Sequence, residues 1–392
     1  MTQRPKTARS RAARPTLEGL EARALLSDMS TAHAEVSAVQ AHPTSQSILQ
    51  NLTPLLTATT VAANGDNNPY GVAFIPKDFP AGGKLKPGDI LVSDFNNGTS
   101  GLQATGVSIV SIDPTGKTTT FFQGSPGLGL NTALGVLPGG FIIVGNTPRT
   151  TDANGTPTVA SGSLLILDRN GNLVETLDAS NPFYKLDGPW GLTIVNQGST
   201  SHVFVSNVLN GTVTRIDMRT FKNGKLPEVM NATVVASGYT VATNAAALVV
   251  GPQGLAFDAR RHVLYVASTA DNAIFTVLHP LEVTSSNGTG TVFARNDGHL
   301  NGPLSLALAP NGHLLVTNGD AILPNAPPPP FNLILEYQPT GTFVAQLPID
   351  NTGIAGGAFG LAIGSTSDHN QILAAVDDNT NSLIEWTIKK TK

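Results

Sequence analysis

The chain has 392 residues and no cysteine, so disulfides, zinc–thiolate sites and thiol nucleophiles are excluded. Its net charge of -4 is unevenly placed, because residues 1–25 are basic and the remainder is therefore acidic. An acidic body does not attract nucleic acid, so we expect no nucleic-acid partner.

Residues 1–50 are rich in Ala, Ser, Thr, Gln and Arg and show weak apolar periodicity. This composition cannot offset the entropy lost on folding, so it predicts a disordered basic N-terminal segment. Residues 20–26, with the sequence LEARALL, resemble the LEPR-XLL segment of exported planctomycete proteins, with Ala22 in the place of the proline. The resemblance implies export to an extracellular or cell-surface location. A solvated basic tail is the alternative.

No stretch of the sequence approaches the roughly 18 consecutive apolar residues that a membrane-spanning helix requires. We therefore expect no transmembrane segment.

From residue 68 onward one pattern recurs six times. It comprises a Pro-x-Gly-like turn, an apolar strand, a second strand ending in Val-x-Asn or Val-x-Asp, and two further strands. The repeats open at Gly71, Gly135, Gly191, Gly254, Ser305 and Gly360. Repeated four-stranded antiparallel units are propeller blades, which must stack because a single blade cannot cover both of its faces. The prediction for residues 51–392 is an all-β, six-bladed β-propeller.

The sixth repeat ends after its third strand, at residues 383–388. Residues 56–62 precede the first blade and are similar to the fourth-strand segments of other blades. We predict that this N-terminal strand pairs with residues 383–388 and closes the ring, which removes the exposed sheet edges.

The repeated columns also carry a resemblance. The Pro-x-Gly and Val-x-Asp/Asn columns, with an Asn three residues later at Asn97, Asn210 and Asn381, resemble the NHL repeat over residues 68–388. The resemblance implies the propeller fold. It leaves function open, because one fold hosts many activities.

Aligned polar residues end the second strands and are candidates for ligand binding at the channel mouth. They are Asp94, Asn146, Asn207, Ser268, Asn318 and Asp378. Their oxygens could form a ring of ligands for a hard cation such as calcium. Alternatively, these side chains cap turns of their own blades.

A second column, after the opening proline position, holds Tyr70, Leu134, Trp190, Gln253, Leu304 and Phe359. The aromatic members could stack a sugar or an apolar ligand at the same mouth. Packing between blades explains them equally well.

Gluconolactonase-like propellers are similar in architecture, and that resemblance implies calcium held by an early glutamate together with Asn and Asp. No glutamate lies in the six strand-opening segments, because Glu175, Glu336 and Glu385 fall in third or fourth strands. The long second-to-third-strand loops, at 94–106, 146–162 and 318–331, are further candidates, because loops on a rigid scaffold often carry binding.

We therefore expect a monomeric, exported propeller that binds a protein, glycan or small molecule through loops at the channel mouth. The alternative is a calcium-dependent hydrolase or lyase of the gluconolactonase-like type. The sequence leaves open whether the chain is an enzyme.

Overall fold

The computed structural model describes residues 46–245, 247–319, 330–365 and 370–389. The chain separates into two units, residues 1–44 and 45–392. The predicted basic segment lies outside the described residues as far as residue 45. The last residues of that segment lead into a short 3-10 helix, η1 (Leu49–Asn51), and Ile48 and Leu49 are buried against the fifth and sixth blades.

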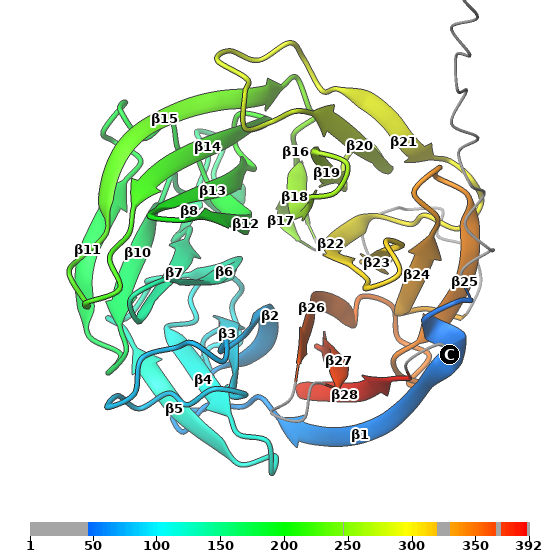
Figure 1. Ribbon diagram of the computed structural model, residues 1–392, viewed down its shortest axis with the longest axis horizontal. Coiled ribbons are helices and arrows are strands. Elements are labelled where there is room, and N and C mark those ends of the chain that lie inside the picture. Colours follow the sequence, from blue (N-terminus) through cyan, green and yellow to red (C-terminus); the bar gives the residue numbers. More distant parts are fainter. Residues whose placement is uncertain (1–45, 246, 320–329, 366–369, 390–392) are drawn as a thin grey trace, which may run out of the picture. The chain divides into compact units, whose positions relative to one another are not determined.

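The second unit is a ring of six four-stranded antiparallel sheets, which confirms the predicted fold (Figure 1). Blade one consists of β2 (Asn67–Phe74), β3 (Ile90–Asn96), β4 (Ser108–Ile112) and β5 (Thr118–Gln123). Blade two consists of β6 (Leu130–Leu137), β7 (Phe141–Asn146), β10 (Ser163–Asp168) and β11 (Leu173–Asp178). Blade three consists of β12 (Pro189–Gln197), β13 (Thr200–Asn207), β14 (Thr212–Arg219) and β15 (Glu228–Ser237). Blade four consists of β18 (Pro252–Asp258), β19 (Val263–Ser268), β20 (Ala273–Leu278) and β21 (Thr291–Arg295). Blade five consists of β22 (Pro303–Leu308), β23 (Leu314–Asn318), β24 (Leu333–Tyr337) and β25 (Phe343–Pro348). Blade six consists of β26 (Ala358–Ser365), β27 (Gln371–Asp377), β28 (Ser382–Ile388) and β1 (Leu52–Thr59).

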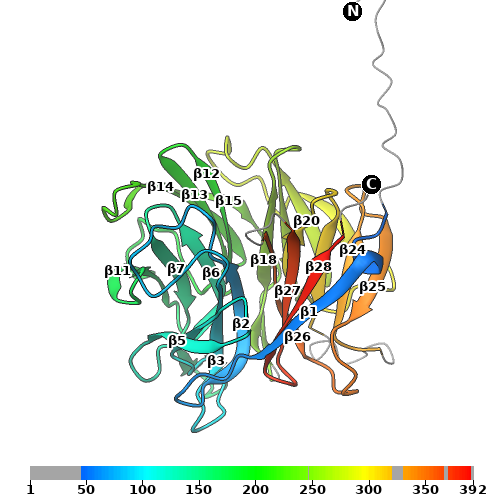
Figure 2. The same ribbon diagram turned by 60° about the horizontal axis from the view of Figure 1, so that its bottom comes forward.

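The N-terminal strand β1 closes the ring as predicted. It pairs antiparallel with β28, with Leu52 opposite Ile388 and Thr59 opposite Ser382, and Figure 2 shows the two strands side by side. The paired stretch is Leu52–Thr59 rather than the predicted residues 56–62. Blade six is thus assembled from both ends of the propeller sequence.

Among the described residues the hydrophobic core is divided into seven clusters, of which six each lie between a pair of neighbouring blades and the seventh joins residues of several blades at one end of the channel. The cluster between blades six and one, for example, joins Ala58 and Leu383 to Val92 and Val110. Hydroxyl groups add bonds between blades, because a residue near the end of some second strands donates to the next blade's first strand. These bonds are Ser93 Oγ to the Asn131 oxygen (2.6 Å), Ser206 Oγ to the Gln253 oxygen (2.7 Å) and Thr317 Oγ1 to the Phe359 oxygen (2.7 Å).

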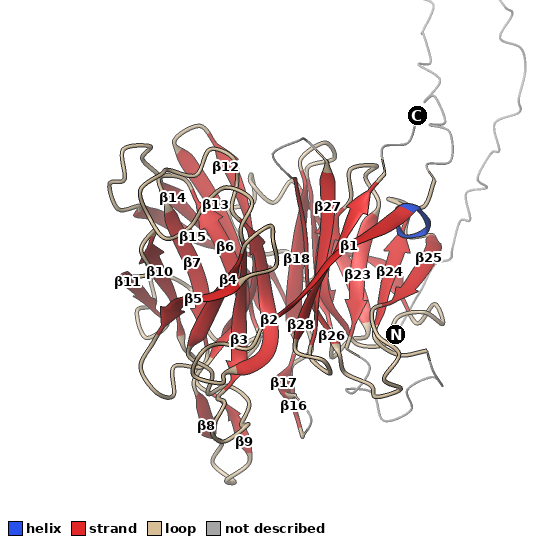
Figure 3. Cartoon of the chain, turned by 90° about the horizontal axis from the view of Figure 1, so that it is seen from below, coloured by secondary structure: helices blue, strands red, loops and turns tan. Residues whose placement is uncertain are grey.

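Two small hairpins interrupt the blade pattern. β8 (Arg149–Thr151) pairs with β9 (Pro157–Val159) inside the second-to-third-strand loop of blade two. β16 (Ala242–Asn244) pairs with β17 (Leu248–Val250) in the connection from blade three to blade four. Figure 3 shows both hairpins projecting from the same face of the ring. No helix among the described residues has the length and apolarity needed to cross a membrane.

Candidate functional site: the two ends of the central channel

The first strand of every blade borders a central channel, and the loops separate into two sets at its ends. Second-to-third-strand loops and blade-to-blade connections, including both small hairpins, lie at one end, which we call the plugged end. First-to-second-strand and third-to-fourth-strand loops lie at the other end, which we call the open end. All the residues proposed from the sequence belong to the plugged end.

The pairing of the first and second strands shows that the repeat alignment made from the sequence is out of register in blades two and six. Asn146, Asn207, Ser268 and Asn318 each pair with the residue that opens the first strand of their blade, and Asp94 pairs with Pro69 near the start of β2. In blade six the partner of Ala358, which opens β26, is Asp377 and not Asp378. In blade two, an extra residue in β6 places Leu134 at the position of Leu192. Thr132 therefore occupies the column in which the sequence alignment placed Leu134.

The three asparagines of this column use their side-chain oxygens within their own blades. Asn146 Oδ1 accepts a hydrogen bond from Ser163 Oγ, Asn207 Oδ1 accepts one from the Asp187 N–H (3.0 Å), and Asn318 Oδ1 accepts one from the Asn301 N–H (3.1 Å). In blade six, Asp377 Oδ1 likewise accepts from the Asn379 N–H (3.0 Å). Each side chain thus fixes a turn or a strand end, as Asx side chains commonly do.

Asp94 differs from the other members of the column. Its side chain is fully buried, and neither carboxyl oxygen has a hydrogen-bond partner among the described residues. Burial, and then the nearby charge of Asp66, raise the pKa of Asp94 well above its usual range. The Asp66 carboxylate itself accepts bonds from Gly98, Val107 and Ser108. The environment of Asp94 therefore favours its neutral form.

The predicted aromatic residues come together and are mostly covered. The Tyr70 ring stacks on Phe95 and on Phe359 with centroid distances of 4.4 Å in both cases, and Trp190 meets Phe95 edge-on at 5.5 Å. Tyr70 and Trp190 are 3% and 1% exposed, and Phe359 is half-buried. Little of these ring faces is left for a ligand.

Apolar residues from loops complete this plug. Its remaining buried members are Ala104, Val159, Val208, Leu248 and Val249, which come from second-to-third-strand loops and from the two small hairpins. The sequence analysis missed these residues and Phe95. A signal for them was present in the sequence: a valine or leucine directly follows the polar end of a second strand, as in Asn207-Val208. Residues of a solvent-exposed turn are usually polar, so an apolar residue there indicates that the turn is covered.

Asp378 lies near Tyr70 at this end. Burial, followed by the charge of Asp377, raises the pKa of Asp378 to about 7. Burial and the charge of Asp378 together raise the pKa of the Tyr70 hydroxyl. The Asp378 carboxyl is thus a titratable group beside the aromatic plug, and no cation of the described residues contributes to its pKa.

The described residues do not fit a calcium site at this end. Calcium requires six to eight oxygen ligands around one point. The column asparagines direct their oxygens to their own blades, and no cluster of three or more acidic or histidine side chains that could hold a metal occurs among the described residues. Most of the loop at 318–331, including Pro327, Pro328 and Pro329, lies outside the described residues.

The opposite end of the channel is open. A cavity of about 430 Å³ is lined there by the first strands of several blades, including Gly135, Thr193, Ala256 and Ala362. A smaller cavity of about 60 Å³ lies next to the plug residues Tyr70 and Phe359. The channel is thus accessible from the end that the sequence analysis did not consider.

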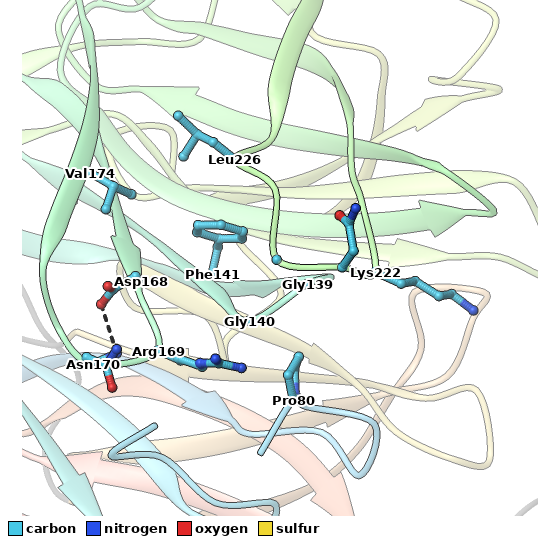
Figure 4. A pocket seen from close by; sticks show the side chains of 12 residues that line it. Pro80, Gly139, Gly140, Phe141, Asp168, Arg169, Asn170, Val174, Lys222 and Leu226 are labelled. Carbon is cyan, nitrogen blue, oxygen red and sulfur yellow. Dashed lines mark hydrogen bonds between the residues drawn. The ribbon is translucent and has the colours of Figure 1, made fainter. Parts of the chain in front are cut away.

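A larger pocket, of about 550 Å³, lies on the open-end face where blades two and three meet (Figure 4). We call it the blade 2–3 pocket. Phe141, Val174 and Leu226 give it apolar walls, and Arg169 and Lys222 are its cationic residues. A further cavity of about 230 Å³ shares Lys222 with the blade 2–3 pocket and Val136 with the 430 Å³ channel cavity, so it adjoins both of them.

Comparison with known proteins places the fold but not the function. The sequence matches no protein-family model and no curated protein. Among solved structures, the chain is similar to a putative gluconolactonase (TM-score 0.50, 13% identity, 88% of this chain and 99% of that chain) and to a luciferin-regenerating enzyme (TM-score 0.50, 10% identity, 86% and 96%). It is also similar to regucalcin, a calcium-binding protein from Agrobacterium tumefaciens (TM-score 0.49, 11% identity, 86% and 96%). At these identities the similarity shows the fold alone, a six-bladed β-propeller.

Proposed function

We propose that this chain is an NHL-type binding propeller rather than a metal-dependent enzyme. The observation that supports this proposal is the aromatic plug. Tyr70, Phe95 and Trp190 are buried at the end where the sequence predicted a binding mouth, so a substrate has no open pocket there among the described residues. Its partner, whether protein, glycan or small molecule, would bind at the open end, where cavities are accessible.

Export to an extracellular or cell-surface location is part of the same proposal. It is supported by the LEPR-XLL-like run at residues 20–26. A monomer is the expected state of a ring whose closing strand β1 comes from its own chain.

A calcium-dependent hydrolase or lyase is the second candidate, and one observation favours it. Both buried carboxyl oxygens of Asp94 lack a hydrogen-bond partner within the described part of the chain, and a cation bound there would convert an unpaired carboxyl into a paired carboxylate. The solved structures of similar fold include a putative gluconolactonase.

Thermal unfolding in millimolar calcium and then in excess chelator tests the two candidates. We expect coincident melting curves for the wild-type chain, because the described residues form no site for the ion. Bound calcium at a hundredfold excess over its Kd would instead stabilise the protein by about 2.7 kcal/mol. The proposal would be refuted by a chelator-dependent drop in melting temperature that the Asp94→Asn variant abolishes.

A further inference from the structure

The blade 2–3 pocket is built by loops from three blades at the open-end face. Pro80 comes from the first loop of blade one, Gly139 and Gly140 from the β6–β7 turn, and Lys222 from the β14–β15 loop. Gly139 lets two of these loops touch, because its φ is +86° and a Cβ there would lie 2.2 Å from the Phe221 oxygen. A side chain at this position would therefore force the pocket walls apart.

Arg169 is held in place before any ligand arrives. Its Nη1 donates to the Ala81 oxygen at 2.9 Å, and its backbone oxygen accepts a bond from the Lys84 N–H at 3.0 Å. The side chain is half-buried, so part of its rotamer entropy is already lost in the free protein. The guanidinium has five N–H donors, and most of them remain available for an anion.

The one carboxylate in the pocket wall is engaged by its own turn. Asp168 Oδ1 accepts bonds from the Asn170 and Asn172 N–H groups at 2.8 and 2.9 Å, and Oδ2 accepts one from Asn172 Nδ2 at 2.9 Å. Burial raises the pKa of Asp168, but these bonds outweigh it, so that the pKa lies below its usual value. The carboxylate stays ionised and repels an anion, yet its lone pairs are directed into the turn rather than towards Arg169.

Lys222 supplies the second positive charge. It is exposed and has no hydrogen bond or ion pair with another described residue. The pocket therefore contains two cations and one anion, a net positive charge within an acidic propeller. Among the apolar lining residues, Val174 is 42% exposed, whereas Phe141 is 6% exposed and offers little of its ring. Positive charge and the apolar surface of Val174 are thus accessible to one small ligand in a pocket of ordinary ligand-binding size.

We propose that the blade 2–3 pocket binds an amphipathic carboxylate. Arg169 and Lys222 bind the carboxylate, and the apolar body of the ligand lies against Phe141, Val174 and Leu226. Charge complementarity selects the acid over its neutral analogue, and the apolar wall selects it over acetate or inorganic anions. This inference rests on the proposed function, because it names the ligand class and the site of a binding propeller.

The test is a fluorescence titration of the full-length chain with naphthalene-2-carboxylate, and with naphthalene-2-carboxamide as its neutral counterpart. We expect saturable binding of the acid, and binding of the amide that is weaker by about tenfold or more, as the loss of a charge-assisted hydrogen bond predicts. The Lys222→Gln variant should weaken binding of the acid by a similar factor and leave the amide unaffected. Arg169→Gln should have at least as large an effect on the acid.

Lys117→Gln is the matched control, because Lys117 is an exposed lysine in a third-to-fourth-strand turn of blade one, outside this pocket. It should bind the acid like the wild type. Equal binding of acid and amide, no effect of Lys222→Gln, or no binding of the acid at millimolar concentration would overturn the inference.

A peptide ending in a free leucine carboxylate, compared with its amidated form, distinguishes a peptide terminus from a small acid as the source of the same group. Calcium-dependent melting would contradict the proposed function without affecting any of these results.

Discussion

Burial raises the pKa of the Glu385 carboxyl to about 7, because its side chain is 5% exposed between β27 and β1. The folded protein therefore keeps a proton that the unfolded chain releases at a pH near 4.5. The free energy of unfolding therefore includes the full contribution of this retained proton below about pH 4.5, and the contribution is lost as the pH rises through 7. Asp377 and Asp378, with pKa values raised to about 6 and about 7, act in the same direction.

We predict that Glu385→Gln stabilises the protein at pH 8 by on the order of 2 kcal/mol and has little effect at pH 4.5, because glutamine cannot ionise. Urea unfolding at the two pH values measures the difference. Glu282→Gln is the control, since the Glu282 side chain is 76% exposed, and it should change stability at neither pH. An equal effect of Glu385→Gln at both pH values would show that the group does not titrate in this range.

At the scale of elements, one buried carboxylate fixes the turn that leads into β1. Glu336 in β24 is fully buried and accepts hydrogen bonds from Ser47 Oγ (2.5 Å), the Ile48 N–H (2.9 Å) and the Leu49 N–H (3.1 Å). His313 Nδ1 lies 2.6 Å from the same carboxylate. Blade five thereby holds the residues that precede the closing strand of blade six.

We predict that Glu336→Ala destabilises the propeller by about 3 kcal/mol or more, because it leaves several buried donors without an acceptor. Glu336→Gln should cost less, since its amide oxygen can still accept. Hydrogen exchange of the Ile48 and Leu49 amides should accelerate in both variants. Unchanged exchange at these two amides would contradict the assigned role of the carboxylate, whatever the global stability does.

Most strands of the blades could be predicted because the same sequence features recur in each blade: an apolar first strand, a polar residue at the end of the second strand, and a turn. The errors occur where one blade departs from the average. An extra residue in β6 moved Thr132 into the column assigned to Leu134, and Val376-Asp377-Asp378 imitated the Val-x-Asp pattern one residue late. Only strand pairing, which is a contact between distant residues, separates these registers.

The site was harder to predict than the fold for a related reason. The sequence identified Tyr70, Trp190 and Phe359 as neighbours, but exposure depends on what covers them, and the covering residues come from hairpins outside the repeat. The blade 2–3 pocket combines Pro80, Arg169 and Lys222 from three different blades. No local motif joins residues so far apart in the sequence.

At the scale of the whole molecule, six clusters of similar composition link the blades in a circle, so weakening one of them exposes the flanks of two blades. The cluster between blades six and one depends on β1, whose inward-facing Ala58 is 7% exposed and packs with Val92 and Leu383. Leu55 lies on the same strand but is 51% exposed. Substitutions at these two positions therefore distinguish the packing of β1 between blades six and one from the pairing of β1 with β28.

We predict that Ala58→Asp lowers the stability of the full-length chain by more than about 3 kcal/mol, because it places an unpaired charge in the cluster that joins the first blade to the last. Leu55→Asp should cost about 0.5 kcal/mol or less, since its side chain remains in water. Thermal unfolding gives the stability difference, and limited proteolysis reports whether β28 has lost its partner strand. If both variants melted alike, β1 would contribute only local strand pairing. A selective loss in Ala58→Asp would instead show that the ring is held closed by the contact between its ends.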